Sequence, residues 1–85
     1  AGVRVNAVCP GPVEDTEGMR RLTPSDEAKA ALVASIPLRR YATKDEVADL
    51  TLFLCSDAAA IITGAVFVCD GGLSLTGTGF GAPPV

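Results

Sequence analysis

The chain has 85 residues, of which 48% are hydrophobic and 20% are charged, and this is the composition of one small globular domain. Its formal charge is −3 and its seven Lys and Arg residues form no long basic run, which argues against nucleic acid as a partner. It contains no histidine, so the commonest general base and metal ligand is absent and we expect no metal site.

The three cysteines, Cys9, Cys55 and Cys69, are an odd number without C-x-x-C spacing. Each lies in an apolar segment, which predicts small buried side chains in a reducing cytoplasm rather than metal ligands or a disulfide. No apolar stretch reaches the length of a membrane span, and no signal peptide opens the chain. We therefore expect a cytoplasmic protein without a membrane partner.

The first predicted element is a strand at residues 3–9, where the side chains alternate in character. It begins almost at once, without an initiator Met, so the chain resembles the middle of a longer protein. Pro10 has no amide hydrogen to donate and Gly11 tolerates unusual dihedral angles, so the strand is expected to end there.

Two helical segments are expected next. Residues 14–22 are polar and fit either a short helix or a mobile loop. Thr23 is expected to cap a second helix, because Pro24 suits the first helical position and acidic residues follow it. Pro37 ends that helix, because the residue before a proline avoids helical dihedral angles.

A third helix has the clearest local signal, since Thr43 and Glu46 have the spacing of a capping box. Its apolar face is wide enough to predict burial on more than one side, and it consists of Val47, Leu50, Phe53, Leu54 and Cys55. Ser56 and Asp57 are expected to end this helix.

A second strand is expected at residues 65–69, followed by Asp70-Gly71-Gly72 and by a flexible or docked tail at residues 77–85. The order strand, helices, strand predicts an α/β fold with two parallel strands and a right-handed crossover. Two strands cannot form an independently stable sheet. The unit is therefore expected to need further strands, from a missing part of its own chain or from a partner.

Five short motifs occur together in a recognisable order. They are Asn6 to Val13, Pro37 to Arg40, Asp45 to Ala48 with Phe53 to Asp57, Ile62 to Gly64, and Val68 to Gly72. In this order they resemble the C-terminal third of a classical short-chain dehydrogenase/reductase. The resemblance implies that residues 1–76 form the C-terminal part of a doubly wound parallel Rossmann sheet, incomplete on its own, with its sixth and seventh strands. Within it, residues 14–35 correspond to the substrate lid.

The resemblance also assigns a cofactor site to the corner after the first strand. Pro10, Gly11 and Pro12 would line the nicotinamide face of NAD(H) or NADP(H), and the Val13 backbone would hydrogen-bond the carboxamide. This agrees with ligand binding at the carboxyl ends of parallel strands, and the prolines would make the corner rigid before the cofactor arrives. The alternative is a plain turn at the end of a strand.

One position departs from the family pattern. The family usually has Thr two residues after the Val13 position, where this chain has Asp15, whose carboxylate would repel a pyrophosphate. Either Thr16 contacts the cofactor through a shift of one residue, or that contact is absent. In the lid, three apolar residues face either a substrate or the lid's own packing, namely Met19, Leu22 and Leu32.

The catalytic parts of the family pattern do not occur in this chain. There is no Gly-rich strand-to-helix turn and no Ser-Tyr-Lys set. Tyr41 and Lys44 are three residues apart rather than the family's four, so no residue here is assigned a catalytic role, and Tyr41 is expected to pack in a linker. Arg39 and Arg40 are expected to form ion pairs or a solvated face, with phosphate binding a minor possibility.

The resemblance implies a fragment of an NAD(P)-dependent oxidoreductase that transfers hydride between nicotinamide and an alcohol or carbonyl substrate. The 85 residues alone are expected to be inactive. The alternative is a non-catalytic interaction module, because family members commonly form homo-oligomers through this region. A weaker third hypothesis is that the chain binds a nucleotide by itself.

Overall fold

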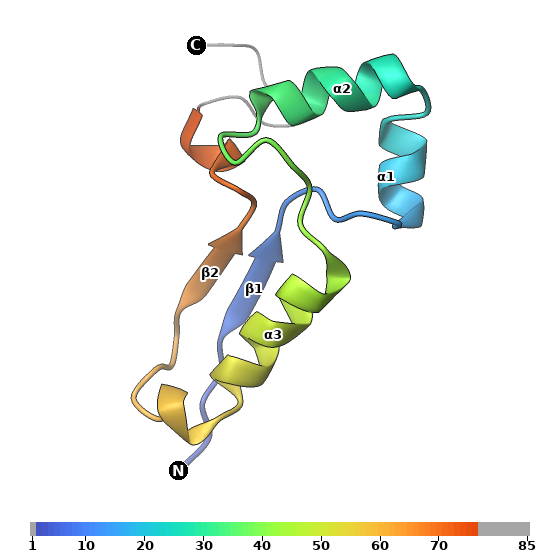
Figure 1. The fold of residues 1–85 in the computed structure, drawn as a ribbon. Coiled ribbons are helices and arrows are strands. Elements are labelled where there is room, and N and C mark those ends of the chain that lie inside the picture. Colours follow the sequence, from blue (N-terminus) through green and yellow to red (C-terminus); the bar gives the residue numbers. More distant parts are fainter. Residues whose placement is uncertain (1, 77–85) are drawn as a thin grey trace.

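A computed structural model describes residues 2–76 of the chain. Figure 1 shows two parallel strands side by side, a helix that runs back along them, and two further helices beyond the carboxyl ends of the strands. In chain order the elements are β1 (Ala7–Pro10), α1 (Glu17–Leu22), α2 (Asp26–Ser35), α3 (Lys44–Leu54), the 3₁₀ turn η1 (Asp57–Ala59), β2 (Val66–Cys69) and the 3₁₀ turn η2 (Leu73–Thr76).

The parallel pairing of the two strands is confirmed, with Ala7 opposite Val66 and Pro10 opposite Cys69. The first strand is shorter than predicted, since residues 3–6 do not join the ladder. The Val5 carbonyl still accepts from the Gly64 amide at 2.7 Å, and the Arg4 side chain donates to the Leu54 and Ile62 carbonyl oxygens at 2.8 and 3.0 Å. These bonds tie the start of the chain to the segment that leads into β2.

The capping residue of α2 was wrongly predicted. Ser25, not Thr23, is the N-cap, and its hydroxyl accepts a hydrogen bond from the Ala28 amide at 3.1 Å. Thr23 instead ends α1, where its hydroxyl donates to the Met19 carbonyl at 2.7 Å. Residues 17–22 are helical, so the ambiguous segment contains a short helix rather than only a loop.

The capping box of α3 is confirmed, since the Thr43 hydroxyl accepts from the Glu46 amide and the Glu46 carboxylate accepts from the Thr43 amide. The predicted burial of α3 on more than one side is wrong. Of its residues only Leu54 is buried, while Leu52 is 69% and Phe53 is 42% exposed. The reason is that α3 packs along β1 on one side and has no described segment on the other.

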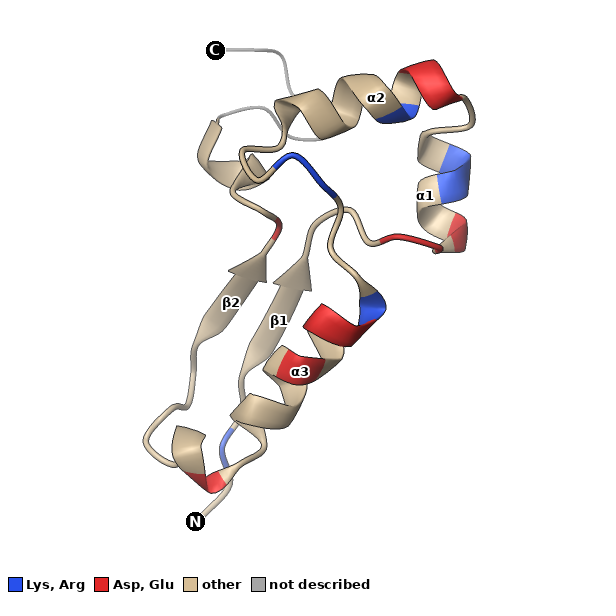
Figure 2. Cartoon of the chain, in the orientation of Figure 1, with Lys and Arg blue, Asp and Glu red and all other residues tan. Residues whose placement is uncertain are grey.

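The buried cluster lies beyond the carboxyl ends of the strands, where α1, α2 and η2 meet. It consists of Met19, Ile36, Tyr41 and Leu73, with Leu32 and Val33 packed against it. The two strands carry no charged residue, and Figure 2 shows the charges on the helices and loops around them. The apolar sheet and the charged surroundings agree with a strand pair that normally lies inside a larger sheet.

The expectation that the cysteines are buried is also wrong. Cys9 and Cys55 are exposed, and Cys69 is half-buried. Cys9 shares one face of the sheet with Val68, which is 56% exposed, because paired residues point to the same side. Nothing in the described part of the chain covers that face.

No helix between residues 2 and 76 is both long and apolar enough to cross a membrane. The predicted tail at residues 77–85 lies outside the described residues.

Candidate functional site

The carboxyl ends of β1 and β2 lie in direct contact. The Gly11 amide donates to the Cys69 carbonyl at 3.1 Å, which continues the ladder one residue past the strand. A Cβ atom placed on Gly11 would lie only 2.5 Å from the Cβ atom of Asp70. Gly11 therefore lets the corner after β1 pass against the corner after β2.

The Val13 backbone is held from one side and open on the other. The Ala42 amide donates to the Pro12 carbonyl, and the Glu14 amide donates to the Ala42 carbonyl, both at 2.9 Å. In this parallel bridge the N–H and C=O of Val13 itself point away from Ala42. The carbonyl accepts from the Thr16 hydroxyl at 2.9 Å. The amide has no hydrogen-bond partner among the described residues, so it is free to donate to a ligand.

The structure places Thr16 at the start of α1. Its hydroxyl donates to the Val13 carbonyl and accepts from the Met19 amide at 3.3 Å, as the N-cap of the helix. Asp15 adopts a left-handed conformation with a φ of 56° and is exposed. Figure 2 shows this acidic stretch between β1 and α1. Thr16 thus has a structural task, and its predicted contact with a cofactor stays a prediction.

A polar hollow of about 190 Å³ lies beside this stretch, between α1, α2 and the buried Tyr41. The Tyr41 hydroxyl donates to the Thr23 hydroxyl at 3.4 Å, and the Lys29 ammonium lies 5.3 Å from the centre of the ring. Tyr41 is only 4% exposed, which confirms that it packs in the linker. Its environment is that of a packed aromatic residue with a polar tip.

The three apolar residues that were predicted to face either a substrate or local packing divide between burial and exposure. Met19 is buried in the cluster, Leu32 packs against it, and Leu22 is 58% exposed. Packing in the cluster with Ile36, Tyr41 and Leu73 therefore accounts for Met19 and Leu32. Leu22 is the one of the three that is available to another molecule.

The Asp70-Gly71-Gly72 turn was not singled out from sequence as part of the site. The Asp70 carboxylate accepts from the Gly72 and Ser74 amides at 2.9 and 2.8 Å. Burial raises the pKa of this carboxyl, but the hydrogen bonds from Ser74 and Gly72 outweigh it and bring the pKa below its usual value. Gly71 has a positive φ of 65°, a conformation that glycine adopts readily. It also has no Cβ, and an added Cβ would lie 2.8 Å from the Ile36 Cγ2, so only glycine lets the turn fit beneath Ile36.

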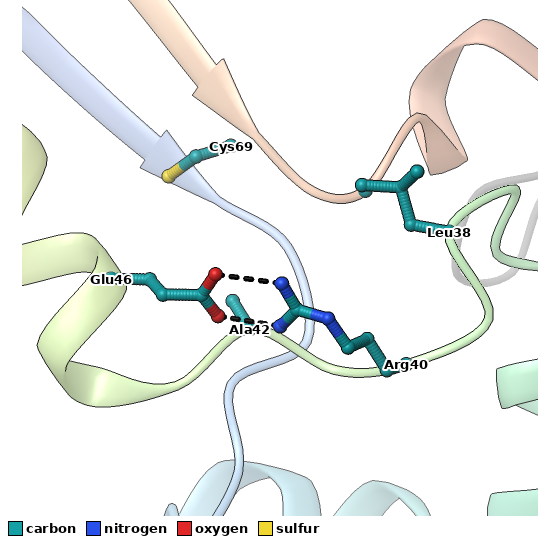
Figure 3. A pocket seen from close by; sticks show the side chains of 6 residues that line it. Leu38, Arg40, Ala42, Glu46 and Cys69 are labelled. Carbon is teal, nitrogen blue, oxygen red and sulfur yellow. Dashed lines mark hydrogen bonds and ion pairs between the residues drawn. The ribbon is translucent and has the colours of Figure 1, made fainter.

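Arg40 and Glu46 form a bidentate ion pair, with N–O distances of 2.6 and 2.7 Å (Figure 3). Arg40 also donates to the Tyr41 carbonyl at 3.2 Å, and Glu46 accepts from the Thr43 amide at 3.0 Å. The hydrogen bond from Arg40 is the main reason that the pKa of the Glu46 carboxyl falls to about 2, so the pair stays charged at neutral pH. The prediction of ion pairs or a solvated face is confirmed, since Arg40 forms the pair and Arg39 is exposed.

The pair borders a hollow of about 220 Å³ at the ends of the strands. Its lining is mostly apolar apart from the pair and consists of Leu38, Arg40, Ala42, Glu46, Cys69 and Gly71. Residues 2–76 contain no cluster of three or more Cys, Asp or Glu side chains suited to a metal ion. The chemistry that this region offers is therefore backbone hydrogen bonding beside a rigid apolar corner.

Comparison with known proteins places these features in context. A family described as enoyl-(acyl carrier protein) reductase matches residues 1–74. The peroxisomal 2,4-dienoyl-CoA reductase of Danio rerio is 51% identical over 76 residues, which are 89% of this chain and 25% of that protein. The 2-(S)-hydroxypropyl-CoM dehydrogenase 3 of Xanthobacter autotrophicus is 46% identical over 86% of this chain and 30% of that protein.

Solved structures give the same result. A short chain dehydrogenase family protein from Francisella tularensis superposes with a TM-score of 0.78 and 38% identity, over 87% of this chain and 34% of that one. A putative 2-deoxy-d-gluconate 3-dehydrogenase from Agrobacterium tumefaciens, solved with bound NADP, gives 0.77 and 32%, over 87% and 30%. The chain thus spans between a quarter and a third of the length of these proteins.

Proposed function

Because the chain belongs to the short-chain dehydrogenase/reductase family, of which it forms a C-terminal segment, we propose that its corner at residues 10–13 binds the nicotinamide end of NAD or NADP. The corner would serve an oxidoreductase that acts on an alcohol or carbonyl substrate. When bound, the cofactor supplies the hydride. Pro10, Gly11 and Pro12 would present a rigid apolar wall, and Val13 would orient the carboxamide.

One observation carries this proposal, namely the Val13 amide. It lies at the carboxyl edge of a parallel sheet, where ligands of such folds bind. Its neighbours on both sides are hydrogen-bonded to Ala42, so its direction is set before a ligand arrives. A fixed amide without a partner costs no reorganisation on binding. A carboxamide oxygen is the acceptor that this donor would take.

Removing the Val13 N–H tests the proposal directly. The protein used is the natural gene product at the length that its gene encodes. When it is titrated with NADH or NADPH, we expect a saturable change in the fluorescence of the cofactor. Val13→Pro removes the donor and leaves both hydrogen bonds to Ala42 available, so we expect the affinity to fall by about tenfold, as for one buried hydrogen bond.

Val13→Ala is the matched control, because it shortens the side chain and keeps the N–H. We expect it to bind the cofactor like the wild type. Equal affinity of Val13→Pro and wild type, with both proteins folded by circular dichroism, would contradict the assignment of the amide. Absence of a saturable change in the wild type would contradict cofactor binding itself.

The remaining parts of an active enzyme would be supplied outside these 85 residues, which contain no Gly-rich turn and no Ser-Tyr-Lys set. We propose a cytoplasmic protein that works on a small molecule, without nucleic acid or membrane partners, and that forms homo-oligomers. The net charge of −3 supports the absence of a nucleic-acid partner, and the free thiols support the cytoplasmic location.

A second candidate function is association without catalysis, and the uncovered sheet face favours it. Val66 and Val68 are 64% and 56% exposed on the face that also carries Ala7 and Cys9. An exposed apolar sheet face of this kind tends to be covered by another chain. Sedimentation of the purified 85-residue chain checks this: we expect a discrete, folded oligomer that does not bind NADH. An unfolded or aggregating chain would argue against the module.

A further inference from the structure

Residues 36–42 form a bridging segment that crosses the carboxyl ends of both strands. Near its start, the Leu38 amide donates to the Gly71 carbonyl at 3.1 Å, just after β2. At its end, Ala42 exchanges two hydrogen bonds with Pro12 and Glu14, just after β1. The bridging segment therefore couples the turn after β2 to the corner that carries Val13.

Arg40 fixes the end of the bridging segment to α3. Its guanidinium contacts the Glu46 carboxylate (Figure 3) and also donates to the Tyr41 carbonyl. The Glu46 carboxylate also accepts from the Thr43 amide. Both residues next to Ala42 on the chain are thus held by one network. A planar guanidinium with two contacts to a carboxylate defines a direction, which a single contact does not.

The ion pair is too exposed to contribute much to the stability of the fold. The side chains of Arg40 and Glu46 are 54% and 45% exposed, and exposed pairs of this kind add little to the free energy of unfolding. Its effect is therefore on geometry. The network holds the residues on both sides of Ala42, and Ala42 is hydrogen-bonded to the residues on both sides of Val13.

We propose that Arg40 and Glu46 are positioning residues that orient the Val13 N–H toward the carboxamide of the cofactor, through the backbone of Ala42. This inference rests on the proposed function of the corner. Neither side chain touches the cofactor in this scheme. Their loss releases the bridging segment, and the Val13 amide then samples directions that do not meet its acceptor.

Arg39 provides a control that distinguishes a positioning role of Arg40 from a simple attraction between its positive charge and a negatively charged cofactor. It is the next residue to Arg40, carries the same charge and is exposed, and it has no ion pair within residues 2–76. If positive charge alone mattered, both arginines would contribute similarly. If the two-contact geometry matters, Arg40→Ala and Arg40→Lys weaken binding and Arg39→Ala does not.

The test measures the dissociation constants of NADH, NADPH and ADP-ribose for the natural gene product and its variants by calorimetry. For Arg40→Ala we expect the constant for the preferred dinucleotide to rise about three- to tenfold, as for a displaced contact. Arg40→Lys keeps the positive charge and loses the two-contact geometry of the guanidinium, so most of the rise in the dissociation constant should remain. ADP-ribose lacks the nicotinamide, so its constant should not change in any variant.

Several results would overturn the inference. One is unchanged dinucleotide binding by Arg40→Ala, and another is full recovery of the affinity in Arg40→Lys. A third is a loss of affinity in Arg39→Ala equal to that in Arg40→Ala. A fourth is a parallel loss of affinity for ADP-ribose, which would indicate general damage to the fold. Glu46→Gln repeats the test from the other side of the pair if Arg40→Ala does not fold. A wild type without dinucleotide affinity would instead contradict the proposed function, and a wild type that binds while Arg40→Ala binds equally would contradict only this inference.

Discussion

Ile36→Ala is expected to lower the free energy of unfolding by about 2–5 kcal/mol, the range for truncating a fully buried Ile. Ile36 is 0% exposed and lies at the centre of the cluster with Met19, Tyr41 and Leu73. Its Cγ2 also fills the space above Gly71. The truncation would leave a cavity at the point where α1 and the end of α2 meet the turn after β2.

Chemical denaturation of the natural gene product measures this effect. Ile61→Ala is the matched control, since Ile61 is 95% exposed, and we expect its change to stay within about 0.5 kcal/mol. Hydrogen exchange locates the damage: amides of α1 and α2 should exchange faster in Ile36→Ala, while those of α3, which has no member in the cluster, should not. Equal unfolding energies for the two variants would show that the cluster does not hold α1 and α2 in place.

The sequence predicted most of the architecture because its signals were local. The two strand segments, the capping box of Thr43 and Glu46, and the end of α2 before Pro37 each depend on a few neighbouring residues. The parallel pairing of the strands was inferred from the order strand, helices, strand. Thr23 was misassigned because Thr and Ser are both good N-caps, so the local sequence fits either residue. The structure shows that the Thr23 hydroxyl instead donates to the Met19 carbonyl at the end of α1.

Burial was predicted less well, because it depends on what lies next to an element in space. The apolar side of α3 and the cysteines were expected to be buried, and the described chain supplies no segment that covers them. The corner at residues 10–13 was recognised from its prolines and its family pattern. The bridge between Val13 and Ala42, and the network through Arg40, join residues far apart in sequence, so no local pattern indicates them.

Gly11→Ala is expected to affect both the fold and the site. Gly11 does not have a positive φ, so the need for glycine comes from space alone. The added Cβ would lie 2.5 Å from the Asp70 Cβ and 2.9 Å from its Cα, and one of the two strand ends must move. Because backbone cannot yield as a flexible side chain does, we expect a loss of about 1–3 kcal/mol in the free energy of unfolding.

The displacement should also reach the corner at residues 10–13, which we propose binds the cofactor. The Gly11 amide bond to the Cys69 carbonyl would lengthen, and Pro12 and Val13 would move with it. Thermal unfolding and titration with NADPH check the two effects in the natural gene product. Gly18→Ala is the control, because nothing lies within 4 Å of a Cβ there, and we expect it to stabilise helix α1 by about 0.5–1 kcal/mol. If Gly11→Ala unfolds like the wild type and binds NADPH equally well, the contact between the two strand ends does not shape the corner.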